Sequence, residues 1–254
     1  MKIAIHQPHY LPWLGYFAKW AAADLFVFLD TVQFEKNGWQ NRNRIKTRDG
    51  PRWLTVPVRV SLGTPIKDVT IDGSQPWPAR HLRMIEHAYA KAPCWPRWRD
   101  RVREFYGGQW THLAPLAAES AAWLARALGI AVPTRLASEI ALPDGDPKDA
   151  TGRLVALCRA VGADTYLAGT ASSYMDLDQF SEAGIAAQPA VGRHEHVDGV
   201  PPQHVLVQHA AAAVLDVVGV GAEGEDVHLS RPEREARPRA SLTENAEGLI
   251  AVHQ

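Results

Sequence analysis

The chain has 254 residues, with 27 basic and 28 acidic side chains and a net charge of −1. This balance gives no general attraction to nucleic acids or anionic membranes, and we expect neither as a partner. The longest apolar run, 210–220, is too short to span a bilayer, and no signal peptide is evident, so we predict a cytoplasmic protein without membrane insertion. Cys94 and Cys158 are too few for a disulfide framework and are interpreted as reduced thiols.

Strands and helices alternate along the predicted chain. The first three elements, 3–6, 13–23 and 25–29, form a strand–helix–strand unit. Extended segments follow over 53–58, 69–71, 134–142, 165–169 and 185–191, and helices over 78–90, 110–128, 149–161, 177–183 and 205–218. This order predicts one α/β domain over 1–220, with a mainly parallel sheet flanked by helices and a helical insertion at about 76–130. The tail, 221–254, is charged and poor in apolar residues, which is typical of mobile segments.

Polar side chains follow the first predicted strand directly: His6, Gln7, His9 and Tyr10. Open α/β sheets bind ligands at the carboxyl ends of their strands. A histidine transfers protons near neutral pH, and Gln and Tyr orient polar substrates. We therefore predict catalytic roles for His6, Gln7 and His9 and substrate contact for Tyr10. The alternative is that His6 bonds a backbone carbonyl and Tyr10 is a core aromatic.

Asp30 and Gln33 follow the second predicted strand and are expected beside the first loop. An aspartate at this position often contacts a sugar hydroxyl, so Asp30 is a candidate catalytic residue and Gln33 a candidate binding residue. A turn or helix-capping role for Asp30 is the alternative. The Gly-x-Gly-x-x-Gly fingerprint of dinucleotide binding is absent after the first strand.

The stretch 41–46 alternates amides with cations. If it is extended, Arg42, Arg44 and Lys46 lie on one side and Asn41 and Asn43 on the other. Such a cluster suits a phosphate or carboxylate ligand, and we predict ligand contacts from Asn41 and the three cations. The alternative is an edge strand whose solvated charges prevent aggregation.

Two other patterns have ordinary explanations. Asp149 and Arg153 are four residues apart on a predicted helix, which favours an i,i+4 ion pair. Four histidines between 194 and 209 lack cysteine partners and zinc-type spacing, so we predict no metal site.

Several of these segments together resemble the WbqC-like protein family. The first block consists of 6–17, 29–34, 40–46 and 53–58, and the second of 149–154, 162–163, 166–169 and 174–176. Members of this family tend to be encoded among bacterial surface-polysaccharide and other specialised biosynthetic genes. The resemblance thus implies an enzyme that tailors sugars or amino-group acceptors, and Arg153 of its second block joins the candidate binding residues.

The start of the chain is also similar to nucleotidyltransferases of the HUP superfamily, in which His-x-Gly-His opens the first helix. Here Trp13-Leu14-Gly15-Tyr16 takes that place. Gly15 would still let a phosphate approach the helix N-terminus, whereas both histidines are missing. The stretch 172–176 resembles the later ligand loop of such enzymes, which makes Gly169 and Tyr174 binding candidates.

These features favour a transferase that moves an acyl or aminoacyl group to an amino group of a nucleotide-linked or phosphorylated small molecule. An ATP-dependent adenylating or nucleotidyl-transferring enzyme is the first alternative, and a non-catalytic binding protein on a degenerate nucleotide fold is the second. A nucleotide, either ATP or a nucleotide sugar, is the one cofactor considered. The oligomeric state is left open.

Overall fold

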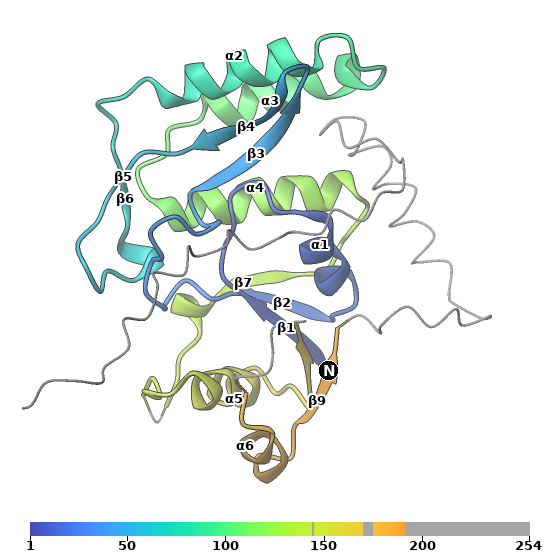
Figure 1. Cartoon of the computed structure of the whole chain (residues 1–254). Helices are drawn as coiled ribbons and strands as arrows, with labels where there is room; N and C mark the ends of the chain where they lie inside the picture. Colours follow the sequence, from blue (N-terminus) through green and yellow to red (C-terminus); the bar gives the residue numbers. More distant parts are fainter. Residues whose placement is uncertain (144, 170–174, 191–254) are drawn as a thin grey trace, which may run out of the picture. The chain divides into compact units, whose positions relative to one another are not determined.

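The computed structural model describes residues 1–143, 145–169 and 175–190. Its central sheet contains five parallel strands in the order β7-β2-β1-β8-β9 (Figure 1). The strands are β1 (Lys2–His6), β2 (Leu25–Phe28), β7 (Thr134–Leu136), β8 (Thr165–Ala168) and β9 (Ala186–Pro189). The predicted α/β fold with a parallel, Rossmann-like sheet is therefore confirmed.

Helices cover both faces of this sheet. On one face lie α1 (Leu14–Ala21) and α4 (Leu113–Ala127), and on the other lie α5 (Ala150–Ala160) and α6 (Leu177–Glu182) (Figure 1). Successive residues of a strand point to opposite faces. Ala4 accordingly packs with α1 and α4, whereas Ile3 and Ile5 pack with α5 and α6. This two-sided burial explains why β1 is a continuous apolar run.

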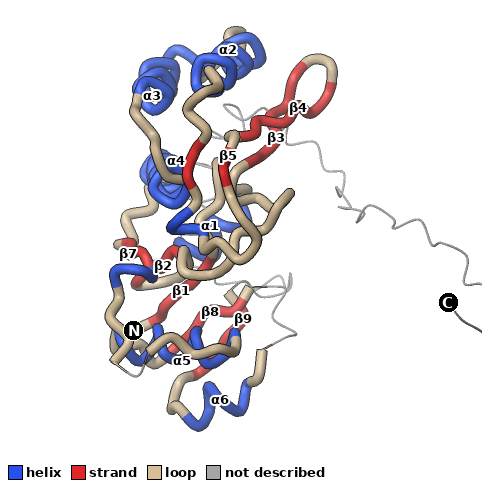
Figure 2. The backbone as a smooth tube through the Cα atoms, turned by 90° about the vertical axis from the view of Figure 1, so that its left-hand side faces the viewer, coloured by secondary structure: helices blue, strands red, loops and turns tan. Residues whose placement is uncertain are grey.

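A second core lies in the region inserted between β2 and α4. It contains β3 (Arg42–Thr47), β4 (Gly50–Thr55), β5 (Val58–Arg59), a 3-10 helix (Ile66–Asp68), β6 (Thr70–Ile71), α2 (Trp77–Tyr89) and α3 (Trp95–Gly107). β3 and β4 form an antiparallel hairpin that projects beside α2 and α3 (Figure 2). Leu54 on its inner face is fully buried against this core.

The structure differs from the predicted elements in three places. The predicted strand over 53–58 is interrupted at Pro57, which has no N–H for a sheet hydrogen bond. α3 was not predicted, although Trp95, Val102 and Phe105 have helical spacing and are buried. The extended segment over 134–142 forms β7 only as far as Leu136.

Other predicted segments lie outside the described residues, among them the helix over 205–218 and the tail over 221–254. In the part of the chain that the structure describes, no helix combines the length and the apolar character needed to cross a membrane.

We predict that the inserted core depends strongly on Leu54. Leu54→Ala should lower the free energy of unfolding by about 2–5 kcal/mol, because it removes buried methyl groups and leaves a cavity. Leu62, which is 97% exposed, is the matched control, and Leu62→Ala should leave stability nearly unchanged. Urea unfolding followed by circular dichroism measures both. Equal stability of the two variants would contradict a packed core at Leu54.

Candidate functional site

The carboxyl edge of the sheet brings three predicted residues together. His6 ends β1, Asp30 follows β2 and Gly169 follows β8, and these strands are parallel. The prediction that they share one edge is confirmed. The chain leaves β1 toward β2 and β7 and later returns to β8 on the other side of β1. This switch point between β1 and β8 is where open α/β sheets commonly bind ligands.

His6 is held as a neutral imidazole. Its Nδ1 lies 3.1 Å from the carbonyl oxygen of Gln7, and because a carbonyl can only accept, Nδ1 must donate the proton. The other ring nitrogen, Nε2, then has the lone pair that accepts protons. The pKa of His6 is lowered to about 4, mainly by burial and also by the nearby charge of Lys19, against the opposing effect of the Gln7 hydrogen bond.

His9 is a second neutral imidazole beside the first. The two ring centroids are 4.8 Å apart, and the Trp13 ring lies 5.5 Å from that of His9. Burial lowers the pKa of His9 to about 3, with a further contribution from His6. Its Nδ1 is buried and has no hydrogen-bond partner among the described residues. A buried polar atom without a protein partner is often a group that bonds a ligand or a water molecule.

Lys19 completes this cluster and is not among the predicted site residues. It lies on the buried face of α1, is 5% exposed, and donates from Nζ to the carbonyl oxygen of Ile5 at 2.8 Å. Burial lowers the pKa of Lys19 to about 8. No carboxylate pairs with it within the described ranges. The sequence does contain a signal for it, because a lysine between Tyr16 and Trp20 on the apolar face of a predicted helix indicates a buried charge.

Gln7 connects the histidine loop to the inserted region. Its Oε1 accepts a hydrogen bond of 2.7 Å from Nε2 of Gln40, which is almost fully buried. In the same area the backbone N–H of Tyr10 donates to the carbonyl of Trp39 at 3.1 Å. The Gln7 side chain therefore positions the loop, and its predicted catalytic role has no geometric support in these contacts.

Tyr10 and Gly15 differ from their predicted roles. Tyr10 is fully buried and its hydroxyl interacts with Tyr106 and with Nδ1 of His81, 3.0 Å away, so it is a core aromatic rather than a substrate contact. A Cβ on Gly15 would lie 2.7 Å from Nε1 of Trp13. The indole thus occupies the space that a phosphate would need at this helix start.

Asp30 also has a structural role. Its Oδ1 accepts from the backbone N–H of Ser138 at 2.9 Å, and its Oδ2 accepts from the Ser138 hydroxyl at 2.6 Å. The side chain is 1% exposed. Both carboxylate oxygens therefore join the end of β2 to the 3-10 helix after β7 (Ala137–Glu139), which is a structural role. The catalytic role of Asp30 stays a prediction.

The predicted alternation of residues along 41–46 is observed in β3. Arg44 and Lys46 are exposed on one face, whereas Ile45 is buried on the other. Asn41 is buried and donates to the carbonyl of Val56 at 2.8 Å, so it holds the hairpin base. Arg42 is half-buried on the same face as Arg44. No hydrogen bond or ion pair joins the three cations to the histidine cluster in the described part of the chain.

The remaining candidates are scattered. Gln33 is exposed and bridges to Pro65. Asp149 does not pair with Arg153 as predicted: it caps α5 by accepting from the N–H of Gly152, and Arg153 pairs with Asp146 at 2.6 Å. This arrangement follows because an aspartate at a helix N-cap bonds the backbone more readily than a side chain one turn away.

Tyr174 and the histidines between 194 and 209 lie outside the described residues.

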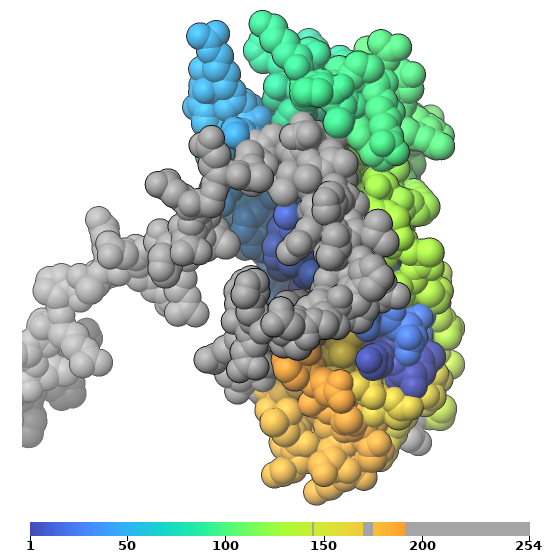
Figure 3. All heavy atoms as spheres, turned by 90° about the vertical axis from the view of Figure 1, so that its right-hand side faces the viewer, coloured from blue at the N-terminus to red at the C-terminus, as the bar shows by residue number. Residues whose placement is uncertain are grey.

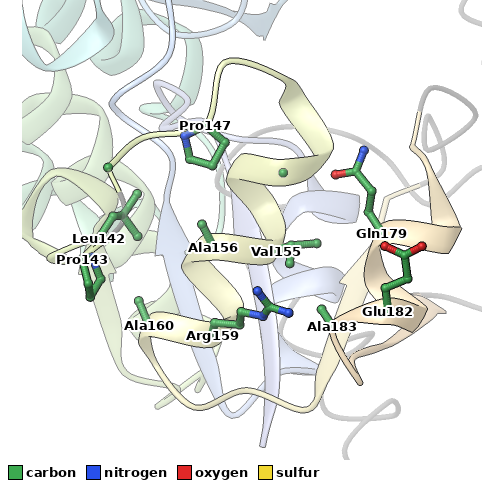
Figure 4. A pocket seen from close by; sticks show the side chains of 12 residues that line it. Leu142, Pro143, Pro147, Val155, Ala156, Arg159, Ala160, Gln179, Glu182 and Ala183 are labelled. Carbon is green, nitrogen blue, oxygen red and sulfur yellow. The ribbon is translucent and has the colours of Figure 1, made fainter.

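A cavity of about 480 Å³ lies elsewhere, on the outer side of α5 and α6 (Figure 4). Its lining includes Val155, Arg159, Gln179 and Glu182, and none of the histidine cluster. We place the candidate site at the sheet edge because buried groups with strongly shifted pKa values converge there, which is typical of functional sites.

The fold and this edge define a Rossmann-like α/β protein with its polar cluster at the switch point. A sequence profile of the WbqC-like protein family matches residues 7–191, and the chain belongs to this family. It is 38% identical over 190 residues to the protein Rv1507c of Mycobacterium tuberculosis, an alignment that covers 72% of this chain and 79% of that protein. No solved structure matches this chain.

We predict that the buried histidines make the protein acid-sensitive. Their folded-state pKa values, about 4 for His6 and His81 and about 3 for His9, lie below the ordinary value of 6.5. The unfolded chain therefore binds more protons below pH 6.5, and stability should fall from pH 6.5 toward pH 4. Each pKa unit corresponds to about 1.4 kcal/mol.

Urea unfolding at pH 7 and pH 5 measures this loss. A His6→Gln, His9→Gln double variant should keep only the part due to His81. A loss of stability with pH that is the same in the double variant and the wild type would contradict the burial of these two imidazoles.

We predict that Ser138→Ala lowers the free energy of unfolding by about 1.5–3 kcal/mol, because it removes a hydrogen bond to a buried carboxylate. The control is Ser61→Ala, since Ser61 is exposed. Chemical denaturation measures both changes. If Ser138→Ala unfolds like the wild type, Asp30 is free for another role.

Proposed function

We propose that this protein is a biosynthetic transferase that moves an acyl or aminoacyl group to an amino group of a nucleotide-linked or phosphorylated substrate. The observation that supports it most is the neutral His6 imidazole at the end of β1, with Nδ1 bonded to Gln7 and Nε2 available. In acyl transfer the amine nitrogen forms a bond to the acyl carbon of an activated acyl donor, and the donor's leaving group departs with the electrons of the broken bond. The amine also loses a proton, and a positioned imidazole accepts it. His6 is thus the proposed general base, with His9 beside it.

The buried ammonium of Lys19 supports an anionic substrate. Lys19 Nζ has the Ile5 carbonyl and the Tyr166 ring, 5.4 Å from the ring centroid, as neighbours. Neither carries the opposite charge that would repay the desolvation of the ammonium. A phosphate bound at the sheet edge would supply the missing negative charge. The same anion would raise the low pKa of His6 and make it a stronger base in the complex. Substrate binding and base strength are therefore coupled in this proposal.

Adenylyl transfer has less support. The enzymes that perform it place a phosphate against the start of the first helix, and here the Trp13 indole lies against Gly15 at that position. The two histidines expected there are replaced by Trp13 and Tyr16. A non-catalytic binding role makes a different prediction, namely that replacing His6 leaves the pathway product unchanged.

A thermal-shift screen over ATP, CTP, UDP- and dTDP-linked sugars and acyl donors tests the substrate class. A ligand at a hundred times its Kd stabilises the folded protein by about 2.7 kcal/mol. We expect a phosphorylated ligand to raise the Tm of the wild type and to have much less effect on Lys19→Met. A shift that persists in Lys19→Met would remove Lys19 from the anion site.

With that ligand, we predict that His6→Gln loses about 10²- to 10⁴-fold in turnover, which is the usual contribution of positioned acid–base catalysis. The ligand-induced Tm shift should persist, because binding is assigned to Lys19. His9→Gln is the control for the neighbouring imidazole. A His6→Gln protein that melts much earlier but turns over normally would show that His6 is a structural strand-end histidine.

A further inference from the structure

The outer face of the β3–β4 hairpin has exposed aromatic rings next to guanidinium groups. Trp53 is 43% exposed and Trp39 is 37% exposed, and their ring centroids are 5.6 Å apart. The guanidinium carbons of Arg42 and Arg44 lie 4.4 Å and 5.2 Å from the Trp53 ring centroid. With Lys46, these residues form what we call the hairpin face. Figure 3 shows the hairpin, in light blue, standing out beside α2 and α3.

The two arginines of this face have different roles. Arg42 donates from Nη1 to Oδ1 of Asn37 at 3.2 Å and from Nη2 to the Asn37 carbonyl at 2.5 Å, so its guanidinium is fixed in place over Trp53. The guanidinium of Arg44 is exposed and has no hydrogen bond or ion pair within the described residues. Arg44 and Lys46 are therefore the cations that are free to bind an anion.

The positive charge of the hairpin is not neutralised by the protein. The hairpin has five cations, which are Arg42, Arg44, Lys46, Arg48 and Arg52. None of them forms an ion pair in the described part of the chain. On neighbouring α3 three of the four arginines, Arg99, Arg101 and Arg103, pair with acids. Five cations without an ion pair among the described residues and one acidic residue, Asp49, thus lie on one short hairpin, and Arg44 and Lys46 on its exposed face are complementary to a small anion.

We infer that the hairpin face binds the nucleoside diphosphate portion of the substrate. The base stacks on an exposed indole, since aromatic side chains bind bases through their flat faces. The diphosphate lies on Arg44 and Lys46, which are two residues apart on a strand and so about 7 Å apart. This inference rests on the proposed function. It assigns the nucleoside diphosphate, which is remote from the reacting group, to the hairpin face and leaves a second anionic group of the substrate to Lys19 at the sheet edge.

The base of the hairpin is tied to the histidine loop. Asn43 donates from Nδ2 to the carbonyl of Leu11, and Gln40 donates to Gln7. The position of the hairpin face is thus coupled to that of His6. A single nucleotide suits this face better than a strand of nucleic acid, because a strand needs a longer track of phosphate contacts and the chain as a whole is not basic.

Titration of the full chain with ADP, UDP and inorganic pyrophosphate, followed by tryptophan fluorescence and calorimetry, tests the inference. We expect a nucleoside diphosphate to bind more tightly than pyrophosphate. Arg44→Ala and Trp53→Leu should each weaken it about tenfold or more, and Trp53→Phe should retain most of the affinity. Arg52→Ala is the matched control, because Arg52 pairs with Ile45 on the inner face of the same hairpin. Its affinity should equal that of the wild type.

Several results would overturn the inference. The inference is wrong if neither ADP nor UDP binds, if Arg44→Ala and Trp53→Leu bind with the affinity of the wild type, or if pyrophosphate binds as tightly as ADP and UDP. Affinity for oligonucleotides that grows with their length would identify a single-stranded nucleic acid as the partner instead. In each case the proposed function still stands if another phosphorylated ligand gives a Lys19-dependent Tm shift. Conversely, hairpin-dependent nucleotide binding together with normal turnover of His6→Gln would retain the inference and remove the proposed function.

Discussion

The central position of β1 is the constraint on which the rest of the structure depends. It pairs with β2 on one side and β8 on the other, and helices cover both of its faces. Its pairing with β2 extends to His6, whereas its pairing with β8 ends at Ala4. The carbonyl of Ile5 faces the β8 side beyond that point, and Lys19 satisfies it. A charged group is thereby buried where the two strands separate.

The electrostatics of the histidine cluster follow from this burial. Desolvation favours the neutral forms of His6 and His9, and the nearby positive charge of Lys19 has the same effect on His6. The cluster thus has two proton acceptors and one cation without an anion in the described residues. The buried ammonium without a counter-charge is the unfavourable part of this arrangement, and it is the reason why an anionic ligand is proposed here.

The inserted region depends on polar residues that serve as internal connections. Gln40 and Asn41 are almost completely buried, and their amides bond Gln7 and the Val56 carbonyl. From the sequence alone, these amides cannot be distinguished from amides that contact a ligand. Both roles require a polar group beside an apolar strand. The cations of β3 differ from them, since the strand's two-residue period places Arg44 and Lys46 on the exposed face.

The sequence by itself determined the strands and helices of the parallel sheet, because hydrophobic periodicity reflects local backbone geometry. It also determined that His6, Asp30 and Gly169 share one edge, since parallel strands end on the same side. Only the tertiary structure decided what each polar residue bonds. The partner of Asp30 is 108 residues away, at Ser138, and that of the Tyr10 hydroxyl is 96 residues away, at Tyr106. Contacts over such separations depend on how the elements pack, and no local pattern encodes them.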